Sequence, residues 1–112
     1  MSALIYCPFP DRDIARKVAA TLIEERRIAC ANILGPVESL YVWQGVRGEA
    51  EEIGVLFKTD ASVLEDAIAR LGALHPYDTP AITGWRCDAA HPATARWLGS
   101  ELAPGRAEPD GN

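Results

Sequence analysis

The fold is decided by residues 28–59, which read IACANILGPVESLYVWQGVRGEAEEIGVLFKT. The first part, residues 28–44, is rich in β-branched and aromatic side chains, which favour strands. A glycine-containing segment at 45–48 supplies turn residues, and a second strand follows over 49–59. These features predict one long β-hairpin. Gly35-Pro36 interrupts its first strand and indicates a bulge or an edge position, because proline donates no hydrogen bond to a neighbouring strand.

The segment before the hairpin predicts a strand and then a helix. Residues 3–7 form a short apolar run, which indicates a buried strand that ends at the prolines that follow. Asp11 has the side chain of a helix N-cap, and Asp13 in the first turn complements the helix dipole. Apolar residues then recur every four positions, so we expect an amphipathic helix that runs to about Arg27.

The segment after the hairpin predicts a second helix, a fourth strand and a short third helix. Ser62 and Glu65 have the spacing of a capping box, and His75-Pro76 ends the helix because the residue before proline avoids the helical conformation. Residues 81–87 are typical of a strand, and Pro92 suits the first turn of the last helix. The order is β-α-β-β-α-β. We therefore predict an α+β fold of the ferredoxin-like type, with two helices on one face of a four-stranded antiparallel sheet.

Length and composition set the domain organisation. The chain has 112 residues, of which 48% are hydrophobic and 24% charged, an ordinary composition for one globular domain. We place this domain at residues 1–103. Residues 104–112 hold two prolines and two glycines and almost nothing apolar, so we expect a disordered tail.

Charge and cysteine content exclude several classes of protein. The formal net charge of −5 argues against a broad nucleic-acid surface, which needs basic residues. No stretch approaches the roughly 18 apolar residues of a membrane span, and the N-terminus has no targeting pattern. The three cysteines are an odd number without paired spacing, which suits free thiols in a reducing compartment. We therefore expect a cytoplasmic protein.

The predicted hairpin is too long for a domain of this size. A strand over 29–44 spans about 50 Å, whereas a domain of this length is about 35 Å across. The tip therefore either folds back at Gly35-Pro36 or projects with the apolar residues 40–43. Apolar side chains on a projecting ribbon need cover, so we expect self-association through the ribbon and the open sheet face. Tyr41 and Cys30 are the interface candidates.

Three unusual motifs are shared with a known family. They lie at residues 28–36 (IACANILGP), 41–45 (YVWQG) and 75–80 (HPYDTP). In order and spacing they resemble the CutA family, named for divalent cation tolerance, over nearly all of residues 3–102. The resemblance implies a ferredoxin-like fold, a homotrimer joined by its long hairpins, and a role connected with copper and other divalent metals. It implies no enzyme activity.

The resemblance also implies metal ligands at Cys7 and His75. Thiolate and imidazole suit copper, and they also suit zinc. Some members of the family have two adjacent histidines where this chain has Leu74 and His75. From the residues alone, two other interpretations stay open. Cys7 could pack as a small apolar residue, and His75 could cap the free carbonyls of the helix that it ends.

A second group of residues predicts a ligand cleft between subunits. Lys58 follows an apolar run, where a lone cation needs a partner or a ligand. Glu52 lies six residues earlier on the same strand, and because strand side chains alternate, it should face the same side of the sheet as Lys58. One interpretation is an ion pair between chains. The other is a cleft in which Lys58 attracts a small anionic ligand, with Trp43 and Tyr77 beside it.

Three functions are compatible with these residues. Sequence templates for serine hydrolases, zinc proteases and phosphate-binding loops are absent, so we predict a non-enzymatic protein without an organic cofactor. The first hypothesis is a homotrimer that binds copper or another divalent metal ion in metal tolerance. The second is a sensor of a small molecule or anion in clefts similar to those of nitrogen-regulatory signalling trimers. The third is a structural trimer that anchors another protein.

Overall fold

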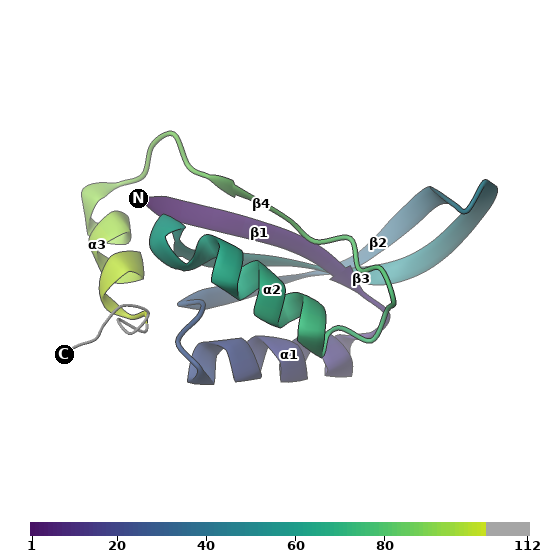
Figure 1. Cartoon of the computed structure of the whole chain (residues 1–112), viewed down its shortest axis with the longest axis horizontal. Coiled ribbons are helices and arrows are strands. Elements are labelled where there is room, and N and C mark those ends of the chain that lie inside the picture. The colour runs from purple at the N-terminus through teal and green to yellow at the C-terminus, as the bar shows by residue number, and fades with distance from the viewer. Residues whose placement is uncertain (103–112) are drawn as a thin grey trace.

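The computed structural model describes residues 1–102 and confirms the predicted order of elements (Figure 1). The strands are β1 (Ser2–Phe9), β2 (Cys30–Trp43), β3 (Val46–Asp60) and β4 (Thr83–Arg86). The α-helices are α1 (Arg12–Glu24), α2 (Leu64–Leu74) and α3 (Pro92–Ser100), and a 3-10 turn over Ala61–Val63 precedes α2. None of these helices is long and apolar enough to cross a membrane. The tail predicted at 104–112 lies outside the described residues.

The four strands form one antiparallel sheet in the order β2-β3-β1-β4. β1 pairs with β3, where Ile5 stands opposite Phe57, and with β4, where Leu4 stands opposite Trp85. Helices α1 and α2 lie on one side of the sheet, and α3 packs against β1 and β3 near the N-terminus (Figure 1). This is the ferredoxin-like arrangement that the sequence predicts.

The core lies between the sheet and helices α1 and α2. Successive strand side chains point to opposite faces, so every second residue of β1 enters this core. The fully buried members on β1 are Ala3, Ile5, Cys7 and Phe9. Leu4 and Tyr6, which alternate with them, are only half-buried. The open face of the sheet therefore presents apolar side chains that α1 and α2 do not cover.

Two predicted helix boundaries are wrong for local reasons. Helix α1 ends at Glu24, three residues early, because Arg26 adopts a left-handed backbone with φ of 58°. The capping box of Ser62 and Glu65 does not form. The Asp60 side chain instead accepts the backbone N–H of Ser62 at 3.0 Å and caps the 3-10 turn that leads into α2.

The hairpin turn is made of Gln44 and Gly45, not of the four residues that the sequence indicated. Both adopt left-handed conformations, with φ of 52° and 80°, as two-residue hairpin turns require. Strand β3 therefore begins at Val46, earlier than predicted. The predicted bulge is confirmed, because the register of β2 on β3 shifts between Ile33 and Gly35.

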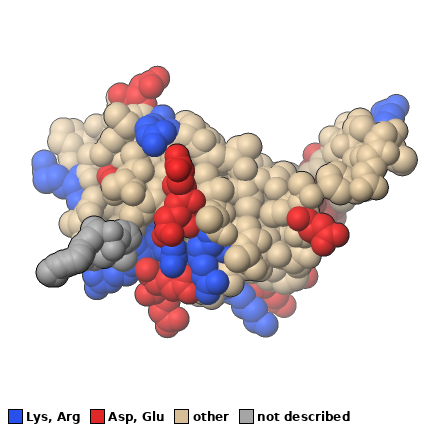
Figure 2. All heavy atoms as spheres, viewed as in Figure 1, with Lys and Arg blue, Asp and Glu red and all other residues tan. Residues whose placement is uncertain are grey.

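The hairpin tip projects from the body of the domain, as Figure 1 shows. The molecule measures 48 × 27 × 26 Å and has a radius of gyration of 14.8 Å. A compact domain of this length has a radius of gyration of about 13 Å. Leu40 and Val42 near the tip are 73% and 67% exposed, and Figure 2 shows a mostly uncharged tip. The hairpin does not fold back on its own sheet, and it presents the apolar ribbon that the sequence predicts.

Candidate functional site

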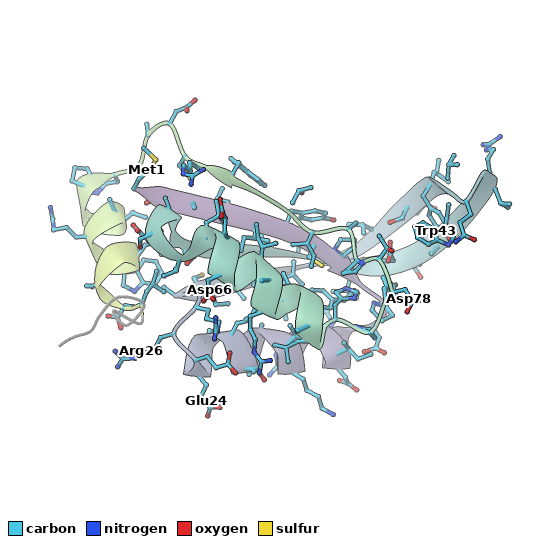
Figure 3. The ribbon with its side chains drawn as sticks, viewed as in Figure 1. Met1, Glu24, Arg26, Trp43, Asp66 and Asp78 are labelled. Atoms are coloured by element: carbon cyan, nitrogen blue, oxygen red, sulfur yellow. The ribbon has the colours of Figure 1, made fainter. Side chains whose placement is uncertain are left out.

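A cavity opens where β1 ends and the hairpin continues. β1 stops at Phe9, opposite Ile53, so the part of β3 nearer the turn has no strand on that edge. Residues 77–81 pass this edge, and a cavity of about 680 Å³ lies between them and the hairpin. Figure 3 labels Trp43 on the hairpin wall and Asp78 on the other wall. The hairpin wall consists of Ser39, Tyr41, Val42, Trp43, Ala50 and Glu52.

The polar centre of this cavity is a carboxylate held by a phenol. Glu52 on β3 is only 8% exposed. Its Oε2 accepts a hydrogen bond from the Tyr77 hydroxyl at 2.8 Å. Burial, together with the Glu52 carboxylate, raises the pKa of Tyr77 to about 12, so the hydroxyl remains a donor at neutral pH. Within residues 1–102, Glu52 forms no ion pair.

Strand register places two aromatic residues of β2 on the same face of the hairpin as Glu52. Tyr41, Trp43 and Glu52 occupy positions of the β2–β3 register whose side chains share one face of the hairpin. Gly48, opposite Tyr41, makes room for its ring, because a β-carbon on Gly48 would lie 2.5 Å from that ring. A larger residue at Gly48 would therefore displace Tyr41 from this position.

His75 follows α2 and is held by two backbone groups. Its Nδ1 accepts the backbone N–H of Tyr77 at 3.2 Å, and its Nε2 lies 2.9 Å from the Pro8 carbonyl oxygen. Because Nδ1 is the acceptor, the ring proton lies on Nε2, and this N–H donates a hydrogen bond to the Pro8 carbonyl oxygen. The ring also stacks on Phe9, with centroids 4.7 Å apart. His75 therefore fixes the loop after α2 to the end of β1, rather than capping the helix carbonyls.

Cys7 reaches the same carbonyl from the core side. Its side chain is fully buried, and its thiol donates to the Pro8 oxygen at an Sγ–O distance of 3.4 Å. Burial, and to a lesser degree the charge of Glu52, raise the pKa of the Cys7 thiol to about 12. The fold thus brings Cys7 and His75 to one carbonyl oxygen, although they are far apart in the sequence. Within residues 1–102, no group of three or more His, Cys, Asp or Glu side chains could hold a metal ion.

Lys58 and Cys30 lie at the other end of the open sheet face. They stand opposite each other in the β2–β3 register. Six strand positions separate Lys58 from Glu52, a distance of about 20 Å. The two charged residues share a face, as predicted, but a single chain does not bring Lys58 next to Trp43 or Tyr77.

Two residues at this site, Phe9 and Asp78, are not predicted from the sequence. Phe9 lies between two prolines, a context that indicates the end of a strand but not the ring that it stacks against. Asp78 lines the cavity. Its position directly after Tyr77, in a loop stiffened by prolines, is the one signal that could have marked it.

Comparison with known proteins assigns this chain to a family. Residues 3–101 match the family described as CutA1 divalent ion tolerance protein. The chain belongs to the CutA1 family. The divalent-cation tolerance protein CutA of Pyrococcus horikoshii is 40% identical over 95 residues, which cover 85% of this chain and 92% of that protein.

Solved structures confirm the CutA1 fold. The divalent cation tolerance protein of Thermus thermophilus superimposes with a TM-score of 0.86 at 32% identity, over 92% of this chain and 100% of that one. The CutA of Xylella fastidiosa gives a TM-score of 0.86 at 34% identity, over 91% of this chain and 98% of that one. The family resemblance seen in the sequence motifs is therefore confirmed.

Proposed function

We propose that this CutA1 family member acts by binding rather than by catalysis, as a homotrimer with a role in divalent-cation tolerance. The tolerance role is supported by the family and by the name of its Pyrococcus horikoshii relative. The homotrimer is supported by the projecting hairpin, whose apolar side chains have no cover within residues 1–102. A two-stranded ribbon is marginal alone and gains stability when it packs against another surface. A reducing cytoplasm suits the three free cysteines.

Light scattering tests the assembly. We expect a mass near three times 12.1 kDa. Val42→Asp at the hairpin tip should lower this mass, because a buried charge without a partner destabilises an apolar contact. Ala69→Asp, on the exposed side of α2, is the control that should leave it unchanged. A wild-type mass of 12.1 kDa at micromolar concentration would refute the homotrimer.

The metal ligands that we propose are Cys7 and His75, and the ion is copper. The supporting observation is their common contact with the Pro8 carbonyl, which places a thiol and an imidazole at one point. Thiolate and imidazole are ligands that suit Cu(I). Binding would require the Cys7 thiol to lose its proton and His75 to release Pro8. Metal affinity should therefore rise with pH.

Anaerobic titration with Cu(I) against a colorimetric chelator tests this site. Wild type should bind one equivalent per chain, and Cys7→Ser should lose it. His75→Gln, which removes the imidazole ligand, should bind more weakly. Cys87→Ser is the matched control, since the Cys87 backbone pairs with Ser2 at the other end of β1. Equal affinity in wild type and Cys7→Ser would exclude the proposed ligands.

The two alternative functions differ in their support. A sensor of small anions has a cavity but lacks a nearby cation within one chain, because Lys58 is not among the residues that line it. A trimer that anchors another protein would use the exposed hairpin surface, and it gains support if neither metal nor small molecule binds.

A further inference from the structure

Helix α3 begins differently from the other helices. The Asp11 side chain caps α1, and the Asp60 side chain caps the 3-10 turn that precedes α2. At α3 the cap is His91, whose ring Nδ1 accepts the backbone N–H of Ala93 at 3.0 Å. The first turn of α3 contains no acidic residue. An imidazole nitrogen therefore takes the place that carboxylates have at the other two helix starts.

The His91 ring can cap α3 only while it is neutral. A neutral imidazole has one nitrogen that accepts a hydrogen bond and one that donates. Because Nδ1 accepts from Ala93, the ring proton lies on Nε2. An imidazolium has a proton on both nitrogens, so its Nδ1–H would meet the Ala93 N–H, and its charge would lie at the positive end of the helix dipole. Protonation therefore replaces a stabilising contact with a repulsive one.

Neighbouring charges do not change over the pH range in which histidine does. Histidine changes charge between about pH 5 and 8, whereas carboxylates stay mostly ionised and amines, guanidinium groups and thiols stay mostly protonated between about pH 5 and 7. Within residues 1–102, His91 belongs to no ion pair. The other titratable groups on α3, on the segment before it and at the adjacent ends of β1 and β3 are the Met1 amine, Lys58, Asp60, Arg86, Cys87, Asp88, Arg96 and Glu101.

Helix α3 is held to the sheet by few buried side chains. Of its nine residues only Leu98 is buried, at 1% exposed, where the helix packs against β1 and β3. A helix of this length is not stable without tertiary contacts. Weakly packed segments open locally at a low cost in free energy, so the loss of one cap changes their open population measurably. Helix α1, by contrast, buries Ala15, Val18, Ala19 and Leu22.

We propose that His91 makes the start of α3 sensitive to pH, so that the first turn is closed at neutral pH and opens more often near pH 5. In the closed state the ring holds the Ala93 N–H, and Leu98 stays buried against the strands. In the open state the first turn unwinds and Leu98 loses part of its cover. Helix α3 lies at the end of the domain opposite the hairpin tip (Figure 1), so this response involves neither the apolar ribbon nor Cys7 and His75.

Amide hydrogen exchange of the full chain, measured by NMR at pH 7 and pH 5, tests the inference. Each rate is corrected for the intrinsic exchange rate of that amide, and the amides of β1 serve as the reference for global unfolding. In wild type, the protection of the Ala93 and Ala95 amides should fall about fivefold or more relative to β1 between pH 7 and pH 5. The loss of a helix cap shifts a local equilibrium by about this factor.

Two substitutions of His91 separate the cap from its titration. His91→Asn keeps a good side-chain acceptor that does not titrate, so its protection should match wild type at pH 7 and persist at pH 5. His91→Ala removes the acceptor, so its protection should already be about fivefold lower at pH 7 and should not fall further. Both variants retain His75, the other histidine of the chain, so a difference between wild type and His91→Asn is due to His91.

Three outcomes would overturn the inference. Wild-type protection of the α3 amides that did not change between pH 7 and pH 5 would do so without relying on any variant. Equal losses in wild type and His91→Asn would assign the response to another group, such as His75. Full protection in His91→Ala at pH 7 would mean that the ring does not stabilise the first turn.

Discussion

The body of the domain and the tip of its hairpin use the same alternating strand pattern with opposite outcomes. In the body, β1 and β3 have strands on both sides, and Ile5 and Phe57 are fully buried. At the tip only β2 and β3 remain, and Leu40, Val42 and Val46 are exposed. Alternation therefore makes a core only where a second layer covers the strands. The body folds around its own core, whereas the tip depends on what it contacts.

The largest effect is expected in the body, from Phe57→Ala. The Phe57 ring is fully buried and meets Phe9 edge-on, with centroids 6.2 Å apart. Removal of a buried phenylalanine ring lowers the free energy of unfolding by about 3–5 kcal/mol. Urea unfolding followed by circular dichroism should show this loss at every protein concentration.

Val42→Asp gives the corresponding test at the tip. Assembly stabilises the folded state by mass action, and this stabilisation increases with the logarithm of protein concentration, so the wild-type urea midpoint should rise with concentration. Val42→Asp should abolish that dependence, and Phe57→Ala should keep it. A wild-type midpoint that did not change over a hundredfold dilution would remove the contrast between the two regions.

Alkaline pH is expected to weaken the body through Cys7. Burial raises the pKa of the folded thiol to about 12, whereas an unfolded thiol ionises near pH ~8.5. Below that pH both states hold the proton and the contribution of Cys7 is complete. Above it the unfolded state alone ionises, so the free energy of unfolding falls by about 1.4 kcal/mol per pH unit until the pH reaches the folded pKa.

Urea unfolding of wild type and Cys7→Ala at pH 8 and pH 10 measures this contribution. The stability of wild type should fall by about 2 kcal/mol more than that of the variant over this interval, because only wild type has the buried thiol. Equal decreases in the two proteins would mean that Cys7 ionises as readily in the folded chain as in the unfolded one.

The sequence predicts the body better than the tip. Asp11, the proline after His75 and the periodicity of α1 each act within a few residues, and each element that they predict is present. The sequence does not locate the turn, because Gly45 and Gly48 are both turn residues by type. The chain uses Gly45 for its left-handed backbone and Gly48 to accommodate a ring.

The cavity depends on features that no local pattern encodes. Glu52 and Tyr77 meet because β1 ends at Phe9 and leaves the edge of β3 open to residues 77–81. Where one strand stops relative to another is decided by register and packing. The alternation of side chains along β3 correctly predicts that Glu52 and Lys58 share one face of the sheet. It does not predict which end of that face is enclosed.

A smaller effect is expected from Asp11→Ala at the start of α1. The Asp11 Oδ1 accepts the backbone N–H of Ile14 at 2.8 Å, and loss of such a cap costs about 1 kcal/mol. Asp13→Ala removes a charge near the helix dipole but no cap, so its cost should be lower. Thermal unfolding of the two variants ranks them. A larger loss in Asp13→Ala would show that charge, and not the hydrogen bond, stabilises this end of the body.

The smallest effect is expected at the tip, from Gln44→Asn. Gln44 has a left-handed backbone that asparagine adopts more readily, and Asn-Gly is the preferred pair in two-residue hairpin turns. The gain in the free energy of unfolding should be about 0.5 kcal/mol or less, measured as a small rise of the urea midpoint. The same gain should appear in the Val42→Asp background, because it acts on the backbone of the turn and not on a contact. A gain confined to the assembled protein would mean that a partner sets the geometry of the turn, and the dependence of the tip would then extend from its side chains to its backbone.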